Sequence, residues 1–244
     1  MNALRRDQDA FGWEIFDHHR GLPAVEICER DDGYINTSSG PAAYFRPHSE
    51  WLPYEQEAIK LARGPALDVG CGAGRVSLHL QSQEMEVLGI DNSPLALKVC
   101  RLRGVKRTKL IEFHRITPAL GCFRTVVMFG NNFGLFGSFA RTRRLLRRLH
   151  TMTKPDARII ASTLDPYQTE DPTHLAYHRL NRARGRMTGQ IRLRVRHRTS
   201  ATPWFDYLFV SKKELLGILD GTGWRMAGCI DARGGSYIAV IEKG

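Results

Sequence analysis

The sequence feature that most constrains the fold is an apolar run followed by a glycine-dense turn, ALDVGCGAGR at positions 66–75. We interpret this segment as a short strand, a tight turn and a helix that begins near Arg75. Glycines at alternate positions let the backbone turn sharply, and they carry no Cβ that would keep a ligand away. The N-terminus of the helix offers unpaired N–H groups to a carboxylate or phosphate of that ligand.

A second apolar strand follows at 86–90 and ends at Asp91. An acidic residue at the end of the second strand, about 20 residues beyond the first glycine, is where the hydroxyls of a nucleoside ribose are held. The order of strand, glycine turn, helix, strand and acid therefore predicts a binding unit for a nucleoside-type cofactor.

The spacing of the glycines distinguishes between two kinds of cofactor. A dinucleotide fingerprint needs its third glycine at the sixth position, where this chain has Arg75, and the third glycine falls one residue earlier, at Gly74. With Asp68 included, the pattern D-x-G-x-G-x-G resembles motif I of the class I S-adenosylmethionine (SAM) methyltransferases. The segment DNSP at 91–94 resembles their acidic ribose loop, and the resemblance covers roughly residues 50–244.

The resemblance implies an α/β fold with a three-layer, Rossmann-like, seven-stranded sheet, mostly parallel, whose antiparallel last strand lies between the fifth and the sixth. It also implies an N-terminal cap segment at 1–48 and a SAM-binding methyltransferase domain at 49–244. An inserted hairpin at 164–210, between strands five and six, would form a lid over the substrate. By the same resemblance, the residues that bind S-adenosyl-L-methionine are Asp68, Gly70, Cys71, Gly72, Gly74, Asp91, Asn92, Ile116, Phe129, Gly130 and Asn131.

Within the predicted lid, four arginines alternate with apolar residues. This arginine row consists of Arg192, Arg194, Arg196 and Arg198. A period of two predicts a strand with one apolar face, and residues 204–210 supply a second strand for a hairpin. The arginine row would either keep an edge strand soluble or clamp an anionic substrate through forked hydrogen bonds.

A second arginine cluster lies at 141–149, where arginines recur at helical spacing opposite Leu145, Leu146 and Leu149. A solvated helix face explains this pattern, and an RNA-binding face would look similar. The formal net charge of +11 fits an anionic partner such as RNA. It equally fits the arginine-rich codon usage of a GC-rich genome.

The acceptor side of the site is less defined than the cofactor side. The candidate substrate-binding residues are Tyr44, Asn132, Tyr167 and Trp204. The candidate catalytic bases are Asp165, His174 and His178. Methyl transfer from a sulfonium needs a base only if the attacking group must lose a proton early, and no sequence cluster predicts a metal.

Composition sets further bounds. No run of 18 or more apolar residues occurs, and no apolar leader is visible near residue 1, so we expect a cytoplasmic protein without a spanning helix. Five scattered cysteines, none in a C-x-x-C pair, predict neither zinc nor a disulfide framework. We therefore expect a SAM-dependent methyltransferase that acts on a small-molecule acceptor. The acceptor would be anionic if the arginine row clamps the substrate. The alternatives are an RNA methyltransferase and a non-catalytic SAM-fold subunit that binds a partner protein; the oligomeric state is left open.

Overall fold

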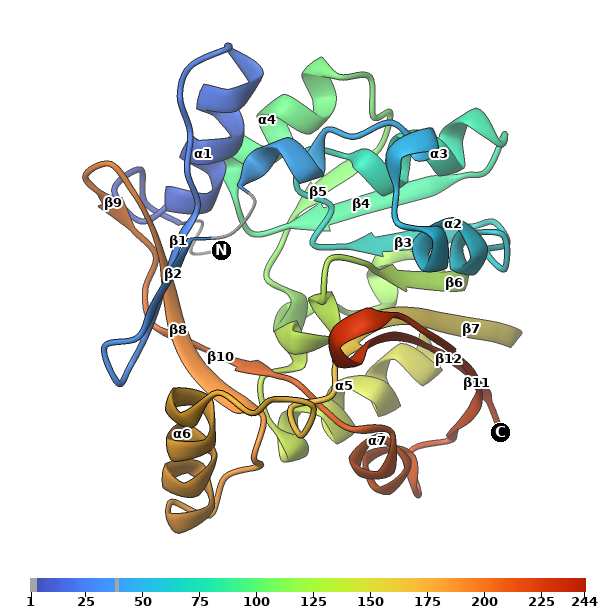
Figure 1. The fold of residues 1–244 in the computed structure, drawn as a ribbon. Helices are drawn as coiled ribbons and strands as arrows, with labels where there is room; N and C mark the ends of the chain where they lie inside the picture. The colour runs from blue at the N-terminus through green and yellow to red at the C-terminus, as the bar shows by residue number, and fades with distance from the viewer. Residues whose placement is uncertain (1–3, 38–39) are drawn as a thin grey trace. The chain divides into compact units, whose positions relative to one another are not determined.

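A computed structural model describes residues 4–37 and 40–244 (Figure 1). The chain forms two compact units. Unit 1 comprises the chain through Leu52, then Gly64–Ile116 and Leu193–Phe205. Unit 2 comprises Pro53–Arg63, Thr117–Arg192 and Asp206–Gly244. Residues 1–3 and 38–39, which belong to the predicted cap segment, lie outside the described residues.

Unit 1 contains the predicted strand-turn-helix-strand motif. Strands β3 (Ala66–Val69), β4 (Val87–Asp91) and β5 (Thr108–Leu110) pair in parallel. Every residue of β3 and β4 is buried, as expected for strands of a parallel sheet covered on both faces. Helix α3 (Arg75–Ser82) follows the glycines and packs on β4, and α4 (Pro94–Leu102) packs on β4 and β5. Ser93 caps α4 by accepting from Ala96 N–H, and Pro94 lies in the first turn, where its missing N–H costs nothing.

The N-terminal part of unit 1 holds strands that the sequence did not predict. After α1 (Ala10–His19), a hairpin forms from β1 (Ile27–Arg30) and β2 (Ile35–Thr37). Strand β8 (Gln190–His197) pairs with β1 and with the two-residue β9 (Ser200–Ala201), and the sheet order is β10-β8-β1-β2, with β10 at Phe205–Leu208. The predicted hairpin is therefore part of a larger sheet. Strands β1 and β2 were not predicted because strands of three or four residues show too few positions for a period of two to be recognised.

The arginine row of β8 has carboxylate partners within unit 1. Arg194 forms a forked pair with Glu29 of β1 at 2.9 and 3.0 Å, and its guanidinium lies over the Trp204 ring, 4.6 Å from the centroid. Arg196 reaches the same Glu29 at 3.3 Å. Arg198 pairs with Asp17 of α1 at 3.1 Å. These contacts account for three of the four arginines without any ligand.

Unit 2 contains the remaining strands of the main sheet. Strands β6 (Phe123–Met128) and β7 (Thr153–Leu164) pair in parallel, whereas β12 (Ser236–Lys243) runs antiparallel to both β7 and β11 (Trp224–Asp231). The order of the seven-stranded sheet is β11-β12-β7-β6-β3-β4-β5. The predicted mostly parallel sheet, with its antiparallel last strand between the fifth and the sixth, is thus confirmed.

Three of the helices of unit 2 are α2 (Pro53–Ile59), α5 (Phe139–Thr151) and α7 (Lys212–Leu219). Helix α7 begins with a capping box, in which Ser211 and Glu214 bond to each other's backbone N–H groups. A fourth helix, α6 (Pro172–Ala183), begins after the Asp171 cap. No helix formed by residues 4–37 and 40–244 combines the length and the apolar character needed to cross a membrane.

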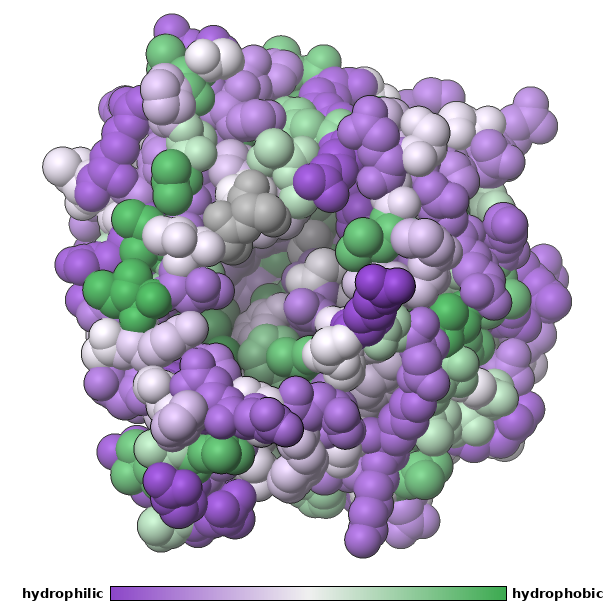
Figure 2. All heavy atoms as spheres, in the orientation of Figure 1, coloured by the Kyte–Doolittle hydropathy of each residue, from purple (hydrophilic) through white to green (hydrophobic). Residues whose placement is uncertain are grey.

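The second arginine cluster lies on α5, whose leucines 145, 146 and 149 are fully buried. Arg143 donates hydrogen bonds to Gly217 O and Ile218 O at 3.2 and 3.1 Å, at the C-terminal end of α7. Arg147 reaches Gly221 O at 3.4 Å. These contacts satisfy carbonyls that the end of α7 leaves without helical partners. Charged and polar side chains also cover most of the face in Figure 2, so part of the arginine excess is an ordinary solvated surface.

Replacing Arg143 by glutamine is expected to lower the free energy of unfolding by roughly 0.5–1 kcal/mol, since two charged hydrogen bonds are lost at a half-exposed site. Urea unfolding of Arg143→Gln, compared with Arg144→Gln on the exposed side of α5, measures this loss. Equal midpoints for the two variants would show that the contacts to α7 contribute nothing.

Candidate functional site

The glycine turn, residues 70–74, adopts backbone conformations that favour glycine. Gly70, Gly72 and Gly74 have φ angles of 70°, 53° and 84°, which L-residues with a Cβ rarely adopt. Gly70 N and Cys71 N both donate to Ile90 O, at 2.9 and 3.1 Å, so the turn is fixed to the end of β4. A Cβ at Gly74 would lie only 2.6 Å from Val105 and 2.9 Å from Cys100. The predicted turn is therefore confirmed in its backbone geometry.

Asp91 faces the glycine turn. Its carboxylate accepts hydrogen bonds from Gly72 N at 3.0 Å and from Ser93 N at 2.9 Å, one on each oxygen. The residue is only 8% exposed, and burial raises the pKa of its carboxyl to about 6 against the effect of these two N–H donors. A carboxylate has about four lone-pair sites, so Asp91 keeps acceptor capacity for two hydroxyl groups.

Asp68 lies beneath the turn and contacts α3. Its carboxylate accepts a hydrogen bond from the Ser77 hydroxyl at 2.6 Å, and the side chain is buried. Burial raises the pKa of the Asp68 carboxyl to about 6, and the Ser77 bond opposes that rise. Asp68 thus holds the first turn of α3 onto β3. Cys71 is also buried, with its sulfur 3.9 Å from that of Cys100.

Helix α1 covers the glycine turn with apolar side chains. From the position that a Cβ of Gly72 would take, Ile15 lies at 3.7 Å and Phe11 at 4.0 Å. The Phe11 ring in turn packs on Tyr44, with 5.3 Å between centroids. Phe11 and Ile15 are functional candidates that the sequence analysis missed, and their i, i+4 spacing places both on one face of α1.

Two side chains fasten the N-terminal segment around the turn. Asp9 accepts from Gly12 N in α1 and from Leu95 N at the start of α4, both at 3.1 Å. Arg103 donates to Ala73 O within the turn at 2.5 Å and to Tyr44 O and Phe45 O at 3.3 Å. These bonds join α1, the glycine turn and the segment after Pro41 into one structure.

The predicted cofactor residues are divided between the two units. In unit 1, Ile116 is fully buried and Asn92 is exposed, next to Asp91. In unit 2, Phe129 is buried and Asn131 has a positive φ of 62°. Asn131 N donates to the Ser162 hydroxyl at 2.7 Å, and Asn131 O accepts from Tyr207 at 2.6 Å. The roles of Phe129, Gly130 and Asn131 in cofactor binding stay predictions.

The predicted substrate and base residues are not all brought together. Asp165 accepts from Tyr167 N at 2.9 Å just after β7. Tyr167 is half-exposed, with its hydroxyl 3.0 Å from both Thr188 and Glu214. His174 and the buried His178 lie one turn apart on α6. Asn132 begins the short 3₁₀ helix at Asn132–Phe136. The choice of a base and the substrate contacts stay predictions.

Helix α1 also contains a buried acid, Glu14, that no sequence motif indicated. Glu14 is fully buried, and neither of its carboxyl oxygens has a hydrogen-bond partner among the described residues. Burial, and then the nearby Glu26 carboxylate, raises the pKa of Glu14 to about 10. Glu26 itself accepts from Tyr44 at 2.7 Å and lies 3.8 Å from the Cys28 sulfur. Strongly perturbed carboxyl groups of this kind occur both at functional sites and in structural clusters of acids.

Residues 66–156 match the family model described as "Methyltransferase domain". The strand order, the antiparallel last strand and a glycine turn bonded to Asp91 define the same class from the structure. The chain therefore has the fold of the class I, Rossmann-like methyltransferases, and its residues 66–156 are similar to their SAM-dependent methyltransferase domain. The cofactor of this family is S-adenosyl-L-methionine.

Individual relatives support this assignment. A ubiquinone biosynthesis O-methyltransferase from Marinobacter nauticus is 32% identical over 81 residues, which are 32% of this chain and 34% of that protein. A SAM-dependent methyltransferase from Bacteroides fragilis, solved with S-adenosyl-L-homocysteine, has a TM-score of 0.85 at 24% identity, over 100% of this chain and 98% of its own. The CcbJ methyltransferase from Streptomyces caelestis has a TM-score of 0.61 at 14% identity, over 82% and 99%. The two structures show the shared fold, and the chain spans about a third of the length of the first relative.

Cofactor affinity is expected to fall as pH decreases through about 6, because Asp91 must be ionised to accept two ribose hydroxyls and burial raises its pKa to that value. The ionised form binds better, so affinity rises with pH and levels off above the pKa. Calorimetry with S-adenosylhomocysteine at pH 5.5 and pH 8 tests this, with Asp91→Asn as the variant that should lack the dependence. An affinity that is flat across this range, in the intact protein, would contradict the role given to Asp91.

Proposed function

We propose that this protein transfers the methyl group of SAM to a small-molecule acceptor. The observation that carries the proposal is the buried Asp91 carboxylate, which faces the glycine turn at 3.0 Å from Gly72 N. Asp91 offers the acceptors that ribose hydroxyls need, while Phe11 and Ile15 provide an apolar wall beside the same turn. These residues fit an adenosyl group.

The chain's own residues have a limited chemical task. Bound SAM supplies an electrophilic methyl group on a sulfonium, so the protein has to hold the acceptor in line with it and to exclude water. Asp91 would bind and orient the ribose. The apolar side chains of α1 would keep water from the glycine turn, and Arg103 would hold the turn and the segment near Tyr44 in register.

The names of four curated relatives favour an oxygen nucleophile, because each of the four is called a ubiquinone biosynthesis O-methyltransferase. An anionic acceptor receives less support from the arginine row. Arg194 and Arg196 already share Glu29, so an anion bound there would have to compete with a carboxylate held by three ion-pair contacts. A neutral or weakly charged hydroxyl compound is therefore the acceptor class that we propose.

A screen with methyl-labelled SAM tests the proposal. Label should pass from SAM to organic-soluble or other small molecules of a cell extract, and bulk tRNA should stay unlabelled. Transfer to tRNA alone would replace the proposal with an RNA methyltransferase. Binding of SAM without any transfer, in extracts and RNA alike, would favour a partner-binding subunit.

A further inference from the structure

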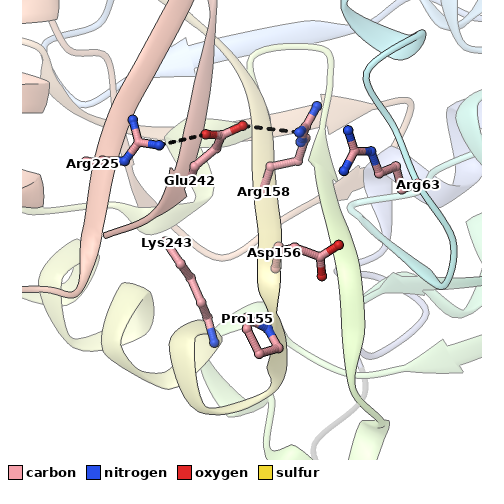
Figure 3. A pocket seen from close by; sticks show the side chains of 8 residues that line it. Arg63, Pro155, Asp156, Arg158, Arg225, Glu242 and Lys243 are labelled. Atoms are coloured by element: carbon pink, nitrogen blue, oxygen red, sulfur yellow. Dashed lines mark hydrogen bonds and ion pairs between the residues drawn. The ribbon is translucent and has the colours of Figure 1, made fainter.

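A pocket apart from the glycine turn lies in unit 2, at the end of the sheet where β7 begins (Figure 3). It encloses about 270 Å³. Its lining residues are Arg63, Pro155, Asp156, Ala157, Arg158, Arg225, Glu242 and Lys243. In open α/β sheets, cofactors and substrates bind beyond the opposite, carboxyl ends of the parallel strands. Asp165, at the carboxyl end of β7, lies seven residues beyond Arg158. In an extended strand this separation corresponds to roughly 23 Å.

The lining of this basic pocket has an excess of positive charge. It contains three arginines and one lysine against two acids, which gives a formal net charge of +4 − 2 = +2. Glu242 is shared between Arg158 and Arg225, at 3.1 and 3.0 Å. The other acid, Asp156, forms an ion pair at 3.5 Å with Arg124, which does not line the pocket. The two carboxylates therefore cannot balance the four cations.

Several donors in the basic pocket still have hydrogen-bonding capacity. The Arg158 side chain is 12% exposed, yet its Nε has no hydrogen-bond partner among the described residues. Arg63 is exposed, and its guanidinium forms no ion pair with any described residue; Figure 3 shows it beside that of Arg158. Lys243 donates to two carbonyls, His150 O at 2.7 Å and Thr153 O at 2.8 Å, and retains one N–H. Neighbouring guanidiniums repel each other unless an anion lies between them.

We propose that the basic pocket binds a phosphate group, with the guanidinium of Arg63 as its forked donor. Arg158 and Lys243 add positive charge, because the Nη atoms of Arg158 already bond to Leu61 O and Glu242. Guanidinium groups match the geometry of phosphate oxygens in a bidentate manner, and a dianion would balance the formal excess of +2. The volume is large enough for the phosphate of a small ester as well as for free phosphate. This site does not depend on the proposed methyl transfer.

The test is calorimetric titration of the full-length protein with inorganic phosphate and with glycerol 3-phosphate, at an ionic strength kept constant with chloride. Saturable binding with one site per chain is expected. Arg63→Gln should weaken it about tenfold, or roughly 1.4 kcal/mol. Arg144→Gln removes the same charge from α5, outside the pocket, and should leave the affinity unchanged. Arg63 lies outside every ion pair of the described residues, so Arg63→Gln should unfold at the same urea concentration as the intact protein.

The outcomes separate clearly. Tighter binding of glycerol 3-phosphate would assign the pocket to a phosphate ester, and equal binding would assign it to the phosphate group alone. An absence of saturable binding, or equal weakening by Arg63→Gln and Arg144→Gln, overturns the proposal. Neither result depends on SAM binding. Titration of the same preparations with S-adenosylhomocysteine measures that binding separately.

Discussion

Replacing Asp91 by asparagine should weaken the binding of SAM by on the order of 100-fold, because hydrogen bonds to a charged acceptor contribute roughly 1.5–3 kcal/mol each. The variant has the same size as the native residue. It loses the negative charge, and its amide nitrogen would point at a backbone N–H of Gly72 or Ser93, each of which now donates to the carboxylate. The effect should therefore appear both in ribose binding and in the position of the glycine turn.

Calorimetry with S-adenosylhomocysteine measures this loss, and circular dichroism verifies that Asp91→Asn is folded. Asp220→Asn, which changes an exposed acid at the end of α7, serves as the matched control and should bind as the native protein does. A variant at position 91 that retains native affinity would remove the basis for placing the ribose at Asp91.

Replacing Glu14 by glutamine should raise the free energy of unfolding at pH 8 by on the order of 2 kcal/mol. The pKa of Glu14 rises from 4.5 to about 10 on folding, so above pH 4.5 the folded chain holds a proton that the unfolded chain releases. Stability conferred by protonated Glu14 is complete below pH 4.5 and is lost progressively as pH rises towards 10. Glutamine is neutral throughout and does not have this loss.

The titratable groups that interact with Glu14 are Glu26 and Cys28, and Tyr44 donates to Glu26; the substitution leaves all three in place. Urea unfolding at pH 5 and at pH 8 should show a stability gain that is small at the lower pH and large at the higher one. Glu57→Gln on the exposed side of α2 should show no gain at either pH. If Glu14→Gln is destabilised at pH 8, the carboxyl is ionised in the folded chain and has a partner that supports its charge.

The main sheet could be predicted because its signals are local. Glycine spacing at 70–74, the acid at 91 and the capping residues Ser93 and Ser211 each act within a few residues of the element that they define. Element ends were less well predicted. Strand β5 ends at Leu110, although the apolar residues Ile111 and Phe113 follow, because a 3₁₀ turn begins there and Glu112 pairs with His114 and Arg115.

Features that depend on distant segments could not be read from the sequence. The arginine row was recognised as alternation, but its partners Glu29 and Asp17 lie some 165 residues or more away along the chain. Glu14 belongs to no motif, and its burial and its neighbours Glu26 and Cys28 depend on the folded structure rather than on the helix itself. The apolar wall over Gly72 was missed for the same reason, since neither Phe11 nor Ile15 belongs to a motif.

The single carboxylate of Asp9 ties the first turn of α1 to the first turn of α4, and this has a practical consequence for any shortened version of the protein. Removing the first twenty residues would strip the apolar wall from Gly72 and leave the Leu95 amide without its acceptor. A truncated protein that lacks this helix would therefore expose the glycine turn to water and would be a poor choice for measuring the proposed nucleoside binding.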